Sequence, residues 1–223
     1  INTVDISKMK YYFRKAIKTY DAETDSSEYR SIEIEIQSAL LALLENKYQK
    51  ASLHINNAIT QATERTYTYL LIPTYNVKAY ILLKKGKIKD AIAVLEQARL
   101  NSEIFGATKY MITIWNSLGI AYYAKGNCLK GQECFTIAEK ILRTYSSADD
   151  CSVRYAPLIA NWLLSSFRND PNIIQRNKGY YQYYDSERIN IILNQLLSNQ
   201  IVNPSIILAE HFPLVHDGYA MMY

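Results

Sequence analysis

The sequence repeats itself at a constant spacing, and this recurrence restricts the chain to a small group of folds. Asn46, Gly86 and Gly126 each interrupt a helical pattern, and they are evenly spaced, since 86−46 = 40 and 126−86 = 40. Small and apolar residues recur in register around the first two: Ala39, Ala42, Tyr48, Ala51, Ile55 and Ala58, then Tyr75, Ala79, Leu82, Ile88, Ala91, Leu95 and Ala98. Three units at one spacing predict stacked helix pairs that share one continuous core.

The third unit, residues 112–142, indicates how the two helices of a pair meet. Its first run carries one stripe of a helix at i, i+3, i+4 and i+7: Trp115, Leu118, Gly119 and Tyr122. Its second run, after a break, carries another on one face: Gly131, Phe135 and Ala138. The small residues would let the two helix backbones approach closely, and the aromatic rings would fill the space around that contact.

This pattern resembles the tetratricopeptide repeat, in which W-x2-L-G-x2-Y is followed by Ala, a large apolar residue and Ala. The match is strong in the first helix and departs in the second, where Gly131 stands in place of the expected Ala. The period exceeds the usual length of roughly 34 residues, as it does in kinesin light chains and some bacterial regulators. The resemblance covers residues 28–145 and implies an all-α fold: a right-handed superhelical array (an α-solenoid) of antiparallel helix pairs.

The whole chain is interpreted as a single array. We assign residues 1–27 to a half repeat, 28–66, 67–106 and 107–146 to full repeats, 147–185 to a degenerate repeat, and 186–223 to capping helices and a tail. Pro73 fits the first turn of a helix, so we expect the second repeat to begin with a helix near 73–85. In the degenerate repeat, a shift of five residues places a first helix near 154–168. We expect the apolar tail, 213–223, to pack on the array.

Composition and charge narrow the class of protein. The net charge of +4 is small, and the one basic cluster, residues 83–89, is interpreted as a solvated turn. Direct nucleic-acid binding is therefore not expected. The three cysteines form no CxxC pair, which favours a reducing, cytoplasmic location. No apolar run reaches about 18 residues, so a membrane span is not expected. Because the chain begins with Ile1 and not Met, we interpret it as a piece of a longer protein.

The residues that usually carry chemistry do not form a recognisable site. His211, His216 and Asp217 are close in sequence, but their spacing across a proline does not correspond to a clear ligand geometry. The cysteines have no histidine near them in the repeat pattern, and the seven glycines form no phosphate-binding loop. The sequence therefore predicts a protein that is not an enzyme and that holds neither a metal nor a cofactor.

A polar stripe next to the buried one provides the candidate binding residues. Asn116, Ile120 and Tyr123 form it in the third unit, and the equivalent positions one unit earlier are Asn76, Tyr80 and Leu83. Asn161 extends the row after the five-residue shift. In the tetratricopeptide family this stripe lines the concave groove, so the resemblance implies that these seven residues bind a peptide. A side-chain amide offers donors and an acceptor to a peptide backbone of any sequence. An ordinary role as helix-surface residues remains the alternative.

The resulting expectation is a non-catalytic domain that binds a protein or peptide segment. We expect it to be the sensing or assembly part of a larger intracellular protein, such as a bacterial regulator acting in signalling or transcription. Two alternatives remain open. The chain could be a self-association module that forms homodimers through its ends, or an accessory domain of an enzyme whose catalytic part lies elsewhere.

Overall fold

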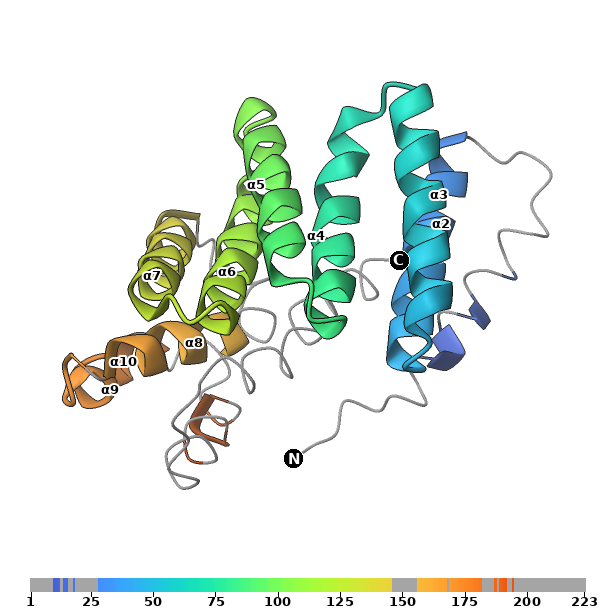
Figure 1. The fold of residues 1–223 in the computed structure, drawn as a ribbon. Helices are drawn as coiled ribbons and strands as arrows, with labels where there is room; N and C mark the ends of the chain where they lie inside the picture. The colour runs from blue at the N-terminus through green and yellow to red at the C-terminus, as the bar shows by residue number, and fades with distance from the viewer. Residues whose placement is uncertain are drawn as a thin grey trace. The chain divides into compact units, whose positions relative to one another are not determined.

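The fold was analysed in a computed structural model that describes residues 28–145, 156–167 and 169–181, together with residues 10–12, 14, 15, 18, 187, 189–191 and 194. Every regular element in these ranges is a helix, and helices that follow one another pack together, as α2 with α3, α4 with α5 and α6 with α7 (Figure 1). This confirms the all-α prediction and the arrangement in consecutively packed helices. None of the described helices is both long and apolar enough to cross a bilayer.

Six long helices follow one another at a constant interval. They are α2 (Glu28–Leu44), α3 (Tyr48–Glu64), α4 (Thr68–Lys84), α5 (Ile88–Ile104), α6 (Thr108–Ala124) and α7 (Cys128–Tyr145). Their first residues are evenly spaced, from 48−28 = 20 to 128−108 = 20. The shorter helices α8 (Ala156–Phe167), α9 (Ile173–Arg176) and α10 (Lys178–Tyr181) follow. The 40-residue recurrence in the sequence therefore spans two helices, each of which begins 20 residues after the one before it.

The same turn closes most of these helices. The residue after the C-cap has a positive φ at Asn46 (57°), Thr66 (57°), Gly86 (72°), Gly106 (59°) and Gly126 (85°). Around Asn46 the amide of Lys47 donates to the Ala42 carbonyl (2.8 Å) and the amide of Asn46 donates to the Leu43 carbonyl (2.9 Å). This pair of bonds is the Schellman motif, which satisfies carbonyls left free at a helix end. It recurs around residues 66, 86 and 126.

The start of α4 differs from the prediction. The helix begins at Thr68, not near residue 73, and Pro73 lies inside it. A proline there removes one backbone hydrogen bond of the helix, yet its ring is buried among the residues of α4 that form the core. The constant interval between helices places the turn at Thr66 and so sets the start of α4. The helix expected near 154–168 agrees with α8 (Ala156–Phe167) within two residues at each end.

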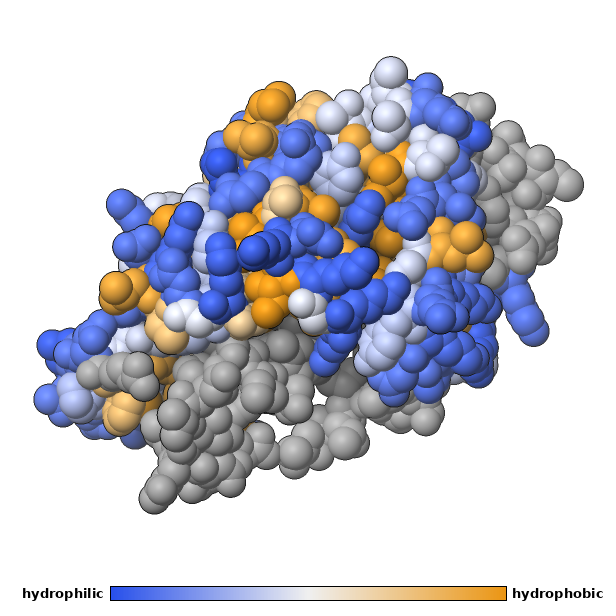
Figure 2. All heavy atoms as spheres, in the orientation of Figure 1, coloured by the Kyte–Doolittle hydropathy of each residue, from blue (hydrophilic) through white to orange (hydrophobic). Residues whose placement is uncertain are grey.

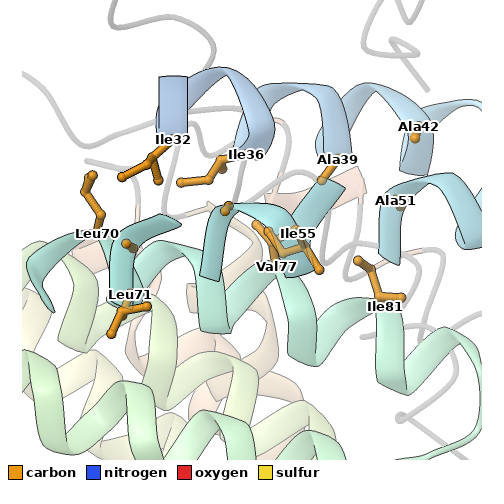
Figure 3. Packing of buried hydrophobic residues seen from close by; sticks show 12 residues of the cluster. Ile32, Ile36, Ala39, Ala42, Ala51, Ile55, Leu70, Leu71, Val77 and Ile81 are labelled. Carbon is orange, nitrogen blue, oxygen red and sulfur yellow. The ribbon is translucent and has the colours of Figure 1, made fainter. Parts of the chain in front are cut away.

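The chain divides into two compact units, the first holding α2 to α5 and the second α6 to α10. In the first unit, alanines lie where α2 and α3 meet: Ala39, Ala42, Ala51, Ala58 and Ala62 (the first three are labelled in Figure 3). Larger side chains, including Ile32, Ile36, Ile55 and Val77, fill the space between α2, α3 and α4 (Figure 3). The buried positions of α3 recur at helical spacing, so this helix buries a single face.

In the second unit, the close contact predicted between α6 and α7 is present. A Cβ built on Gly119 would meet the Phe135 ring, with 2.6 Å to Cδ1 and 2.8 Å to Cζ. A Cβ on Gly131 would meet the Tyr123 ring, 2.6 Å from Cε2, and would lie 3.0 Å from the Gly119 carbonyl oxygen. Both glycines are therefore needed for this packing. The departure at Gly131 from the repeat pattern is explained, because the ring of Tyr123 occupies the place of an alanine methyl group.

Helix α8 packs on α7. The guanidinium of Arg143 on α7 lies 3.8 Å from the ring centroid of Tyr180 and 5.5 Å from that of Trp162. The two rings meet edge to face with their centroids 6.3 Å apart. This cation–π cluster joins α7, α8 and α10.

The two ends of the predicted array are described only in part. The described residues of the expected half repeat are helical, and Arg14 forms an ion pair with Glu45 at 2.8 Å. Hydrogen bonds from Lys47 and Arg14 lower the pKa of Glu45. The predicted tail, 213–223, and the histidines at 211 and 216 lie outside the described residues.

Candidate functional site: the amide pair of α6 and α8

Helices α4 and α6 differ from their partners in how much of their circumference is buried. On α7 the buried positions, such as Gly131, Phe135, Ala138 and Leu142, follow one face. On α6 buried residues succeed one another without a gap from Asn116 to Tyr123. Burial on all sides identifies α4 and α6 as the inner helices of their pairs. Polar side chains on them are therefore held away from water, where their hydrogen bonds have to be accounted for one by one.

Two of the predicted site residues meet in the second unit. Asn161 Nδ2 on α8 donates a hydrogen bond of 2.9 Å to Asn116 Oδ1 on α6. Asn161 is 3% exposed and Asn116 is 0% exposed. The two residues are 161−116 = 45 positions apart, which is the period of the repeat plus the five-residue shift. The structure thus brings together the asparagines that the shifted register had aligned.

The Asn116 amide is only half used. Its oxygen accepts from Asn161, whereas its nitrogen Nδ2 is buried and has no hydrogen-bond partner in the part of the chain that the structure describes. The polar neighbours of Asn116 along α6 satisfy themselves locally, because the Thr113 hydroxyl donates to the Tyr110 carbonyl and the Ser117 hydroxyl to the Thr113 carbonyl, both at 2.9 Å. A buried donor without an acceptor costs about 1–3 kcal/mol. Asn116 Nδ2 is therefore a group that an external acceptor would stabilise.

Tyr123 differs from its predicted placement. We expected it to line a groove beside Asn116, but its ring stacks on Phe135, with centroids 5.6 Å apart, and it covers Gly131. It therefore belongs to the contact between α6 and α7. The reason is the absence of a Cβ on Gly131, which opens a space on α7 large enough for the ring. Ile120 is fully buried and belongs to the core of the second unit.

The remaining three predicted residues belong to the first unit. Asn76 and Tyr80 on α4 are 3% and 7% exposed, and Leu83 is half-buried. The ammonium of Lys84 lies 5.4 Å from the Tyr80 ring centroid, at the edge of the range for a cation–π contact. In their own units, Asn76 and Asn116 occupy equivalent positions on α4 and α6, and both are buried.

The sequence interpretation missed Ser165 and the cation–π cluster of Arg143 with Trp162 and Tyr180. Ser165 lies one helical turn after Asn161 and therefore on the same face of α8. Its hydroxyl is buried and donates to the Trp162 carbonyl at 2.9 Å. Arg143 also forms an ion pair with Glu139, a buried carboxylate on the same helix. The i, i+4 spacing of Glu139 and Arg143 was the available signal for the ion pair. Nothing in the spacing indicated the aromatic partners.

Within the described residues, no group of three His, Cys, Asp or Glu side chains lies together as metal ligands would. The site is a neutral amide pair in an apolar setting, and its chemistry is hydrogen bonding. Comparison of the chain with models of protein families, with curated proteins and with solved structures found no match.

Proposed function

We propose that this chain is a right-handed superhelical array of the tetratricopeptide type and that it binds an extended segment of a protein or peptide without catalysing a reaction. The constant interval between helix starts and the glycine-mediated contact of α6 with α7 support the array. The lack of a CxxC pair among the three cysteines and the sensing role expected for such repeats favour a place inside a larger cytoplasmic regulator.

The observation that carries the binding proposal is the unpaired nitrogen of Asn116. Leucine has nearly the shape of asparagine, and leucines at both 116 and 161 would leave no donor of the pair buried without a partner, whereas the asparagines leave Asn116 Nδ2 unpaired. A peptide carbonyl would also satisfy the donor, with a net gain of about 0.5–1.5 kcal/mol for the hydrogen bond. The asparagine pair is therefore worse than a pair of leucines for stability alone and better for holding a ligand.

Burial of the amide pair sets how a ligand reaches it. Asn116 and Asn161 are almost fully buried, so the contacts that cover them have to open before a peptide can bind. The apparent dissociation constant is then the intrinsic one divided by the fraction of open molecules. We expect association rate constants below the ordinary range of about 10⁵–10⁷ M⁻¹s⁻¹, because the binding-competent state is a minority.

The test replaces both amides at once, Asn116→Leu together with Asn161→Leu. Replacing both partners of a buried hydrogen bond by apolar groups of the same shape is nearly neutral or stabilising, so the variant should fold. Peptides enriched from a random phage library on the parent chain should bind the variant about threefold to tenfold more weakly, the worth of one net hydrogen bond. Calorimetry with the selected peptides measures the loss.

The matched control is Asn57→Leu, the same change at an exposed position of α3. It should leave peptide affinity unchanged. Equal affinity of the parent and of the double-leucine variant for every selected peptide would remove the amide pair from the binding surface. A library that yields no peptide specific for the parent chain would remove the function itself.

Self-association is a second candidate, favoured by an exposed apolar patch in the first unit. The patch consists of Tyr69, Leu100, Ile104 and Phe105, and Ile104 is 77% exposed. The rings of Tyr69 and Phe105 meet edge to face at 5.9 Å. Figure 2 shows apolar residues at the surface over the end of α5. The dependence of solution mass on protein concentration, in the parent and in Ile104→Lys, decides whether this patch pairs two copies.

A further inference from the structure

The chemical character of the amide pair restricts the ligand beyond its being a peptide. Asn116 presents one donor, Nδ2, because its oxygen already accepts from Asn161. A lone neutral donor can pair with a carbonyl oxygen or with a carboxylate oxygen. The charges of the surrounding helices decide between these two acceptors.

Positive charge is scarce on the two helices that hold the pair. Helix α8 (Ala156–Phe167) has no charged residue, and α6 (Thr108–Ala124) has one, Lys109. Lys109 precedes Asn116 by seven residues, about 10 Å along the helix axis. On α7, the Lys130 ammonium lies 4.4 Å from the Tyr122 ring centroid, and Arg143 pairs with Glu139 and contacts the rings of Tyr180 and Trp162. These two cations are already engaged by groups of the chain itself, and the third cation of α7, Lys140, is exposed at the surface.

Among the described residues, α8 therefore offers a buried anion no counter-ion, and α6 offers only Lys109, two helical turns from Asn116. Moving a carboxylate or phosphate from water into such surroundings is far more costly than burying a neutral amide that keeps its hydrogen bond. The other buried side chains of α8, apart from Asn161, Ser165 and Ser166, are apolar. The setting thus favours neutral backbone flanked by apolar side chains and disfavours chain ends and acidic residues.

Ser165 adds a complementary position one turn away. Its hydroxyl proton is used by the Trp162 carbonyl, so its oxygen is left to accept. Asn161, which donates to Asn116, and Ser165 are four residues apart on α8, a rise of about 6 Å. This is close to the spacing of about 6.6 Å between every second residue of an extended peptide. A ligand carbonyl at the amide pair and a ligand N–H at Ser165 would then come from the same edge of one strand-like segment.

We infer that the α6–α8 site binds a neutral, extended, interior segment of a polypeptide and rejects a terminal carboxylate. A carbonyl of the bound segment accepts from Asn116 Nδ2, and an N–H of the segment donates to Ser165 Oγ. This inference rests on the proposed function. It adds the class of ligand and assigns Ser165 as a second ligand-binding residue.

Two random-peptide libraries test it on the full chain. In one, each peptide is flanked by folded protein on both sides. In the other, each peptide ends in a free C-terminal carboxylate. Only the flanked library should yield binders. For a selected peptide, a free carboxylate placed at the residue that meets Asn116 should weaken affinity at least tenfold. Ser165→Ala should weaken it about threefold to tenfold, the worth of one net hydrogen bond.

The outcomes separate the inference from the function beneath it. Binders confined to the free-carboxylate library, or rich in Asp and Glu, would overturn the inference and leave peptide binding intact, provided that the double-leucine variant still loses them. Unchanged affinity in Ser165→Ala would remove Ser165 from the site. Binding that survives in the double-leucine variant would overturn the proposed function as well.

Discussion

At the scale of single residues, the size of each side chain between paired helices is matched to its neighbour. Tyr123 packs over Gly131 in the third repeat. The equivalent pairs one and two repeats earlier are Leu83 with Ala91 and Leu43 with Ala51. A larger residue on the first helix is thus combined with a smaller one on the second. The departure of Gly131 from the tetratricopeptide pattern is compensated by a local exchange of volume.

This exchange predicts a strong coupling between the two positions. Gly131→Ala should destabilise the chain by about 1–3 kcal/mol, because the added methyl group collides with the Tyr123 ring. Tyr123→Leu alone should also destabilise, because it leaves a cavity over the glycine. The double variant recreates the pairing of the second repeat and should recover about 0.5–3 kcal/mol relative to the sum of the single changes.

Urea denaturation of the four proteins measures the coupling. Gly179→Ala is the control for Gly131→Ala, since a Cβ at residue 179 meets nothing within 4 Å. Additive effects of the two single changes would show that Tyr123 and Gly131 do not exchange volume.

At the scale of elements, the turns determine the helix boundaries more than the helices do. Five turns at residues 46, 66, 86, 106 and 126 place one residue at positive φ. Glycine and asparagine adopt this conformation readily, whereas a β-branched residue there is strained. Thr66 is the only β-branched residue of the five, and its hydroxyl donates to the Arg65 carbonyl at 2.7 Å.

Thr66→Asn should therefore stabilise the chain, by up to about 1 kcal/mol, because a left-handed conformation costs most side chains about 1–2 kcal/mol and asparagine less. Gly106→Thr, which places a β-branched residue at an equivalent turn position, should destabilise the chain by a similar amount. A Cβ at Gly106 meets no atom within 4 Å, so backbone strain is the cause being measured. Thermal unfolding compares both variants with the parent. No loss of stability in Gly106→Thr would contradict this explanation of the turns.

The turns also show what could be predicted from the sequence. Gly86, Gly126 and Asn46 are strong turn residues at one spacing, so the helix pairs followed from them. Gly106 lies midway between Gly86 and Gly126 and indicates the shorter period of single helices. Thr66 carries no such signal, which is why the start of α4 was predicted at Pro73 and not at Thr68. The 20-residue interval between helix starts therefore determines where α4 begins, although proline is favoured in the first turn of a helix.

The candidate site was predictable in part for a similar reason. Helical register and a five-residue shift aligned Asn116 with Asn161, and the structure joins them. The burial of both residues and the unused donor depend on how α6, α7 and α8 pack, which a register alone does not describe. Tyr123 was assigned to the wrong face because its rotation into the pair follows from a missing Cβ on another helix.

At the scale of the whole molecule, stability should be local. In repeat arrays each unit contacts its neighbours, so a lesion opens the helices around it before distant ones. Gly119→Leu places a large side chain against Phe135, in the second unit. We expect faster hydrogen exchange in α6, α7 and α8, with the amides of α2 and α3 unchanged. Mass spectrometry of exchanged peptides measures both.

Gly179→Leu is the matched control, since residue 179 is exposed and has open space around it. It should leave exchange unchanged throughout. Equal acceleration of exchange in every helix of Gly119→Leu would mean that the chain opens as one cooperative body.

Because the helices follow one another at a constant interval and form pairs, it matters whether an inserted number of helices is odd or even. Within each unit the long helices pair with a neighbour in the chain, and the inner helices α4 and α6 each precede a helix that buries one side. An insertion of one helix with its turn would make every later inner helix an outer one, and the amides of α6 would face water. An insertion of two helices with their turns would restore both direction and layer. Natural or engineered changes in the length of this protein should therefore survive only as an even number of helices.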